Sequence, residues 1–167
     1  WAGNVLQGDF GEDLDQNRVN EEFSRRVWVS LRLLMLGTLL GATIGVIVGV
    51  VSAVRQYEFF DRSTSLFAYF ILSTPVFLLA ILLKFLGIKF NDAIGSTFFF
   101  TQGEYTPGYE GSSFGRFGDR LQHLILPTLS IALGSISFYS RYQRNTMLDV
   151  LSSDHLRTAR AKGLTKR

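Results

Sequence analysis

The sequence of 167 residues contains no cysteine and only two histidines. Without thiolates the chain cannot form disulfides, cysteine zinc sites or iron–sulfur clusters. His123 and His155 lie far apart in the sequence, so a histidine-rich metal site is not expected either. We therefore predict that the chain itself binds no metal.

Charge is missing from two long stretches of a chain that is otherwise well supplied with it. Residues 33–54 and residues 66–83 contain no Asp, Glu, Lys or Arg. At about 1.5 Å per helical residue, each run approaches the length needed to cross a ~30 Å hydrocarbon core. A third run, at residues 124–140, is shorter and more polar, which indicates a span buried against others. We predict an all-α, polytopic transmembrane helical bundle with about three spans; large core helices of a soluble protein are the weaker interpretation.

Ionisable groups are also missing from the middle of these runs. Arg32 and Lys84 stand near span ends, where long basic side chains can reach the lipid headgroups. A proton- or sodium-coupled carrier usually needs buried Asp, Glu or His to hold its coupling ion. The sequence therefore argues against an ion-driven carrier, a proton pump and a membrane metalloenzyme, unless other spans carry such groups. Energy would then have to arrive from outside the membrane.

Basic residues dominate the last segment of the chain, and the positive-inside rule places that segment in the cytoplasm. Arg25 and Arg26, at an outer span end, count against this orientation. The expected segments are an extracytoplasmic segment 1–26, a transmembrane helix 27–54, a cytoplasmic loop 55–65, a transmembrane helix 66–90, an extracytoplasmic loop 91–120, a transmembrane helix 121–142 and a cytoplasmic segment 143–167.

The expected loop 91–120 is rich in glycine and aromatic residues, and Pro107-Gly108 is typical of a turn. Its aromatic side chains fit an interfacial belt or a small folded cap over the membrane. A docking surface for an extracytoplasmic binding protein is the third interpretation.

Glycine recurs at every fourth position of the first span, at Gly37, Gly41, Gly45 and Gly49. Such overlapping GxxxG units allow two helix backbones to approach closely. The stripe is either a static helix–helix contact or a surface on which helices slide during transport. Both interpretations stay open.

Ser73 and Pro75 lie in the middle of the second apolar run, and Pro127 lies near the outer end of the third. Proline removes a backbone donor and clashes with the preceding turn, so we expect a kink or local opening. Ser73 or Thr74 can satisfy the freed carbonyl. A kinked helix either lines a pathway or only shapes packing.

The sequence of residues 155–162 predicts a short basic helix after the third span. Residues 152–154 are helix-capping types, and Gly163 is expected to cap the other end. Leu156 and Ala159 share one face of this helix, while the basic residues project elsewhere. The helix either binds anionic lipid or presses into a groove on a soluble partner. A nucleic-acid role is not expected because no base-stacking platform accompanies the charges.

The same segment resembles a known signature. Residues 154–164 (DHLRTARAKGL) are similar to the EAA loop of ABC importer permeases, and most similar to the form Y-V-R-T-A-R-A-K-G-L of the B-type subunit of dipeptide, oligopeptide and nickel permeases. The general pattern EAA-x3-G falls on Arg157, Thr158, Ala159 and Gly163. Arg157 and Thr158 depart from that pattern but match the peptide-type form. His155 stands where that form usually has tyrosine.

Other blocks agree with the family in order and spacing, so the resemblance covers essentially the whole chain. They are GDFG at residues 8–11, STPVF at 73–77, LPTL at 126–129 and the R-x-x-R-x-x-M-L pattern at 141–148.

This resemblance implies a multi-pass permease subunit of the bacterial inner (plasma) membrane that forms a pathway for di- or oligopeptides. The implied partners are a second permease subunit, two cytoplasmic ABC ATPase subunits and an extracytoplasmic substrate-binding protein. ATP and Mg²⁺ would bind to the ATPase subunits, because this sequence has no Walker motif; the chain would be no enzyme and would hold no cofactor. It would also lack the first helix, the rest of the EAA loop and the last helices of the family.

Two sets of residues carry these expectations. The set implied to dock on an ATPase is Asp154, His155, Leu156, Arg157, Thr158, Ala159, Arg160, Lys162 and Gly163. The candidates for helix packing or the pathway are Gly37, Gly41, Gly45, Gly49, Ser73, Pro75 and Pro127. The alternatives are a permease for nickel or another small solute, a membrane scaffold without a pathway, and an ion-coupled carrier.

Overall fold

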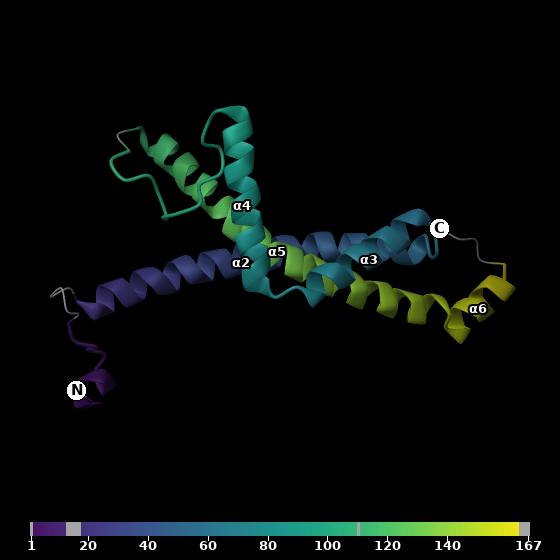
Figure 1. The fold of residues 1–167 in the computed structure, drawn as a ribbon. Coiled ribbons are helices and arrows are strands. Elements are labelled where there is room, and N and C mark those ends of the chain that lie inside the picture. Colours follow the sequence, from purple (N-terminus) through teal and green to yellow (C-terminus); the bar gives the residue numbers. More distant parts are fainter. Residues whose placement is uncertain (1, 13–17, 110, 164–167) are drawn as a thin grey trace.

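The computed structural model describes residues 2–12, 18–109 and 111–163, and Figure 1 shows their arrangement. These residues form the helices α1 (Ala2–Leu6), α2 (Val19–Val54), α3 (Phe59–Ser73), α4 (Val76–Ile94), α5 (Ser113–Leu151) and α6 (Asp154–Ala161). Within the same ranges the only β-type pairing is an isolated bridge between Glu12 and Arg18. The predicted all-α fold is confirmed.

The two longest helices, α2 and α5, pack against each other and run in the same direction. Gly37 lies against Ile131 near one end of the contact, and Gly49 lies against Ser140 near the other. A chain that follows α2 must therefore return before α5 begins. Since α3 and α4 are the helices between them, the return path consists of these two.

In a water-soluble protein large apolar side chains are mostly buried, but here many of them are exposed. Most buried positions hold small or polar residues such as Ala53, Ala68 and Ser137, while Met35 and Phe70 expose 70% and 64% of their surface. Lipid removes the penalty for exposed apolar surface, and close helix packing favours small residues at the contact. The distribution therefore fits helices that stand in a membrane.

Two of the described helices, α2 and α5, are long and apolar enough to cross a membrane. A third crossing results if α3 and α4 are counted as one broken span. At about 1.5 Å per residue, the 15 residues of α3 are only about 22 Å long, which is less than a ~30 Å hydrocarbon core.

The break between α3 and α4 falls at Thr74 and Pro75, and it turns the helix axis by 108°. Proline has no N–H, and its ring keeps the preceding residue out of the helical region. Thr74 is accordingly extended and donates its N–H to the Ile71 carbonyl, while its hydroxyl binds the Phe70 carbonyl at 2.9 Å. The expected disturbance at Pro75 is present, and the span predicted over residues 66–90 consists of parts of two helices. Figure 1 shows α4 rising at a steep angle to α2, and α4 keeps a contact with α5, where Gly87 lies beside Leu126.

Other predicted bounds also need correction. α2 begins at Val19 rather than at residue 27, and residues 59–65, expected in a loop, form the first turns of α3. α4 continues to Ile94, and α5 takes in residues from both segments expected to flank its span. The backbone hydrogen-bond ladder continues through these stretches, because a helix need not end where its apolar run ends.

Residues 95–109 and 111–112, which we call the cap, lie between α4 and α5 and are fastened at three places. Asn91 binds the backbone of Phe98 and Phe99, and Asp119 accepts hydrogen bonds from the backbone and the hydroxyl of Thr106 at 2.8 and 2.6 Å. The third fastening is an ion pair of 2.6 Å between Arg32 on α2 and Glu104. The pairing of Arg32 was not foreseen from the sequence, which suggested a contact with headgroups. The segment is thus a folded cap rather than an open loop.

Candidate coupling site

The helix α6 is attached to the end of α5 by a turn of two residues. Ser152 donates its N–H to the Leu148 carbonyl, and Ser153 donates its N–H to the Val150 carbonyl, so the turn closes tightly. α6 then runs from Asp154 to Ala161, close to the predicted range of 155–162. Figure 1 shows it at the far end of α5, away from α4.

The predicted docking residues all fall on α6 or directly after it. Thr158, Lys162 and Gly163 are exposed, and Leu156 is half-buried. Gly163 has a φ of +84°, the left-handed conformation that suits glycine at a helix C-cap. His155, Arg157, Ala159 and Arg160 belong to the same helix, but their side chains lie outside the described part of the structure.

An ion pair between Arg144 and Asp61 fastens α5 to α3 near this end. The Nε and Nη2 groups of Arg144 donate to the two carboxylate oxygens of Asp61 at 2.5 and 2.8 Å. Two parallel hydrogen bonds of this kind fix the orientation of the partners as well as their distance. The Asp61 side chain is 3% exposed and that of Arg144 is 21% exposed, so water competes little for the carboxylate.

The Asp61 carboxylate accepts two more hydrogen bonds, one from the end of α2 and one from the turn between α2 and α3. The hydroxyl of Ser52, at the end of α2, donates at 2.5 Å, and the backbone N–H of Tyr57 donates at 2.9 Å. Tyr57 has a φ of +68°, which costs a non-glycine residue about 1–2 kcal/mol. The carboxylate therefore holds the turn as well as the neighbouring helix. We call Asp61 and Arg144, together with Ser52 and Tyr57, the clamp.

Arg141 makes a second contact between α5 and α3. Its guanidinium lies over the ring of Tyr69, 4.1 Å from the ring centroid, in a cation–π arrangement. Arg141 and Arg144 are three residues apart, so they lie on the same side of α5. The R-x-x-R pattern thus attaches α3 at two positions along its length.

Four residues of these contacts were not expected from the sequence: Asp61, Tyr57, Ser52 and Tyr69. Arg144 was expected only as part of the R-x-x-R-x-x-M-L pattern. One signal was present, because Asp61 is an acidic residue just before an uncharged run. Nothing in the sequence paired it with an arginine 83 residues later.

The predicted glycine stripe lies in the contact between α2 and α5. A Cβ atom on Gly49 would stand 2.6 Å from the Ser140 carbonyl oxygen, and one on Gly45 would stand 2.9 Å from the Ile136 carbonyl oxygen. A Cβ on Gly41 would overlap the Ser135 side chain, and one on Gly37 would meet the Ile131 side chain at 2.7 Å. Only glycine permits this distance between the two backbones.

The other pathway candidates are not brought together at one site. Ser73 and Pro75 are exposed beside the break. Pro127 lies within α5 and lines a cavity of about 300 Å³ with Lys84, Phe100 and His123 among others. The His123 ring is stacked on Phe100 with a centroid distance of 4.1 Å. Lys84 therefore borders a cavity, whereas a contact with headgroups was expected.

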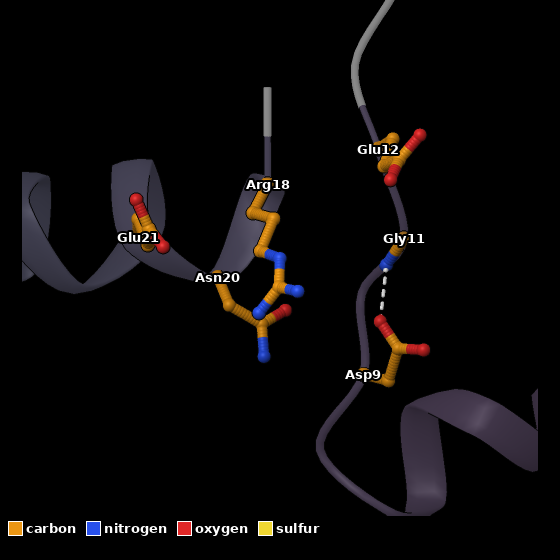
Figure 2. A pocket seen from close by; sticks show the side chains of 6 residues that line it. All are labelled: Asp9, Gly11, Glu12, Arg18, Asn20 and Glu21. Atoms are coloured by element: carbon orange, nitrogen blue, oxygen red, sulfur yellow. Dashed lines mark hydrogen bonds between the residues drawn. The ribbon is translucent and has the colours of Figure 1, made fainter. Parts of the chain in front are cut away.

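The GDFG block folds back against the first turn of α2. The Gly8 carbonyl accepts from the Asn20 amide at 2.5 Å, and the Phe10 N–H donates to the Asn20 side-chain oxygen at 2.9 Å. Gly8 and Gly11 have φ values of +82° and +86°, which only glycine adopts without strain. Figure 2 shows the neighbouring pocket, with the Gly11 N–H bound to the Asp9 carboxylate.

Residues 45–167 match the family described as binding-protein-dependent transport system inner membrane component. The whole chain is 48% identical to the oligopeptide transport system permease protein OppB of Mycobacterium tuberculosis, of which it covers 51%. It is 36% identical to AppB of Bacillus subtilis, which carries the same description, over 98% of this chain and 49% of that protein. It is also 32% identical to the glutathione transport system permease protein GsiC of Salmonella choleraesuis, over 99% of this chain and 48% of that protein. The chain thus spans about half the length of the curated relatives it matches.

Proposed function

This chain belongs to the family of binding-protein-dependent transport system inner membrane components, and on that premise we propose that it is part of a permease subunit of an ATP-driven ABC importer. In this role α2, the pair α3–α4 and α5 cross the bacterial inner membrane and contribute to the translocation pathway. α6 lies on the cytoplasmic face and docks on an ATPase subunit as the coupling helix.

The observation that carries this proposal is the short connection of a small helix to an end of the bundle that is itself firmly held. α6 follows α5 after two residues, and the clamp ties the end of α5 to α3 and to the end of α2. A helix that only rested on lipid would need no such attachment, whereas one that receives force from a partner does. The family match over residues 45–167 includes both α6 and the clamp.

Peptides are the proposed substrates. Two of the relatives named above are described as oligopeptide permeases and the third as a glutathione permease, and glutathione is itself a small peptide. A permease for nickel or another small solute is the alternative, because the extracytoplasmic binding protein contributes much of the choice of substrate.

The proposed assembly contains a second permease subunit, two cytoplasmic ABC ATPase subunits and an extracytoplasmic substrate-binding protein. ATP and Mg²⁺ bind to the ATPase subunits, and this chain takes no part in the chemistry of hydrolysis. The cap lies on the outer side, where the binding protein delivers substrate.

A cysteine crosslink tests the docking of α6. Ala161 is exposed at the end of α6, and these 167 residues contain no cysteine that would compete. We expect Ala161→Cys in the full-length permease to crosslink to a cysteine in a groove of the co-expressed ATPase subunit, and the yield to change when ATP is added. The matched control is Ala93→Cys near the end of α4, which should give no such crosslink.

An Ala161 crosslink that never forms, or an equal yield from Ala93, would refute the docking role. Docking without any peptide uptake by the reconstituted transporter would retain the coupling helix but refute the proposed peptide substrates.

A further inference from the structure

The bond between Asp61 and Arg144 is built to fix geometry rather than to add stability. A buried ion pair contributes little net stability compared with apolar side chains of similar size. A fork of two hydrogen bonds, at 2.5 and 2.8 Å, instead sets both the distance and the orientation of α3 relative to α5. Ser52 and Tyr57 occupy the remaining acceptor sites, so the carboxylate has little freedom to turn.

On the α5 side, only a short stretch of helix separates the clamp from α6. Arg144 and Leu151, the last residue of α5, are separated by 151 − 144 = 7 residues, or about 10 Å of continuous helix. α6 begins three residues after Leu151. Arg144 is thus separated from α6 only by the last turns of α5 and by Ser152 and Ser153.

On the other side of the clamp, α3 contacts α5 at two positions and ends at the break before α4. Asp61 lies in the first turn of α3, and Tyr69, under Arg141, lies near its end. At the break, each of two backbone hydrogen bonds joins residues on the same side of it. The Thr74 N–H donates to the Ile71 carbonyl, and the Leu78 N–H donates to the Pro75 carbonyl. α3 is thus tied to α5 at two points, and the hydrogen bonds at the break do not fix the angle between α3 and α4. α4 has a separate contact with α5, where Gly87 lies beside Leu126.

We propose that Asp61 and Arg144 are positioning residues for transport. They carry a displacement of α6 through α5 to α3, and the break at Thr74–Pro75 converts it into a change in the angle of α4. This inference rests on the proposed function, because it needs a partner that moves α6.

The test is Asp61→Asn in the full-length permease, assembled with its partner subunits in proteoliposomes. Import of a labelled peptide that the parent transports, ATP hydrolysis and the Ala161 crosslink are measured on the same preparation. We expect the crosslink and hydrolysis to persist while uptake per ATP hydrolysed falls about tenfold. The matched control is Glu22→Gln, the same acid-to-amide change at an exposed carboxylate bound by Arg25 and Arg26, which should leave the ratio unchanged.

A second variant separates positioning from folding. Asp61→Asn with Arg144→Gln leaves no unpaired charge, so we expect it to accumulate in the membrane like the parent even if the single variant does not. Two amide side chains cannot form the pair of parallel hydrogen bonds that the guanidinium and the carboxylate form. Uptake per ATP hydrolysed should therefore still be about tenfold lower than in the parent. If uptake per ATP instead recovers together with accumulation, the pair has only a structural role and the inference is overturned.

The two proposals fail in different ways. If Asp61→Asn shows the same ratio of uptake to ATP hydrolysis as the parent, the inference is overturned. The Ala161 crosslink, and with it the docking role of α6, is not affected by that result. Absence of that crosslink when Asp61 is intact overturns the proposed function itself.

Discussion

The α6 end and the cap end of the bundle are both fastened by a carboxylate, but the surroundings differ. At the α6 end, Asp61 is closed in by a bidentate guanidinium, a hydroxyl and a backbone N–H. At the cap end, Glu104 and Arg32 form a single contact of 2.6 Å with side chains that are 22% and 42% exposed. The first arrangement excludes water from the carboxylate, and the second leaves the pair in contact with it.

The lengths of the connections explain the difference. The turn after α2 has the four residues 55–58, so one buried carboxylate can fix the turn and the next helix together. The cap is too long for one contact, so Asn91 and Asp119 each bind a separate part of it. A short connection can be fixed by one buried carboxylate, whereas a long one is held at several separate points.

The largest expected effect comes from making the same change at both ends. We expect Asp61→Ala to lower the free energy of unfolding by about 3–5 kcal/mol, because Arg144 is left without its partner. Glu104→Ala should cost less than about 1 kcal/mol, since the Arg32 side chain stays partly solvated. Equilibrium denaturation of the full-length permease in detergent measures both, and equal losses would remove the distinction between the two ends.

The glycine stripe allows a similar comparison along one contact. A Cβ on Gly49 would stand 2.6 Å from the Ser140 carbonyl oxygen and 3.1 Å from the Arg144 backbone nitrogen, so two backbone groups would have to move. A Cβ on Gly37 would meet the Cβ and Cγ2 atoms of Ile131 at 2.7 Å, and its nearest backbone atom, the Thr128 oxygen, is at 3.4 Å, an ordinary contact distance. We expect Gly49→Ala to cost about 1–3 kcal/mol and Gly37→Ala to cost less. Gly134→Ala is the control, because a Cβ there has nothing within 4 Å. The yield of folded protein in the membrane gives the order, and a larger loss for Gly37 would contradict it.

The smallest expected effect concerns how α3 and α5 begin. The Ser112 hydroxyl accepts a hydrogen bond from the Gly115 N–H at the start of α5, so Ser112→Ala should cost about 1 kcal/mol. Glu58 precedes α3 without a side-chain cap bond, and Glu58→Ala should change little. Thermal unfolding of the two variants in detergent checks this, and a greater loss for Glu58 would mean that α3 depends on its cap more than on the clamp.

Much of the fold was predictable because it depends on local patterns. The uncharged runs indicated the helices, the four-residue spacing of glycine indicated a close contact, and Pro75 indicated a disturbance in the second span. The 108° turn was not predictable, because proline permits a bend whose size is set by packing around it. Asp61 and Arg144 were missed because no short-range rule joins residues so far apart in sequence.

The parallel contact of α2 and α5 has a consequence for synthesis. Gly45 meets Ile136, so 136 − 45 = 91 residues must be added before the partner of the glycine stripe exists. At roughly 5–20 residues per second, α2 waits on the order of 5–20 s. During that time its smooth glycine face lies open in the lipid, where any other helix with small residues can occupy it first.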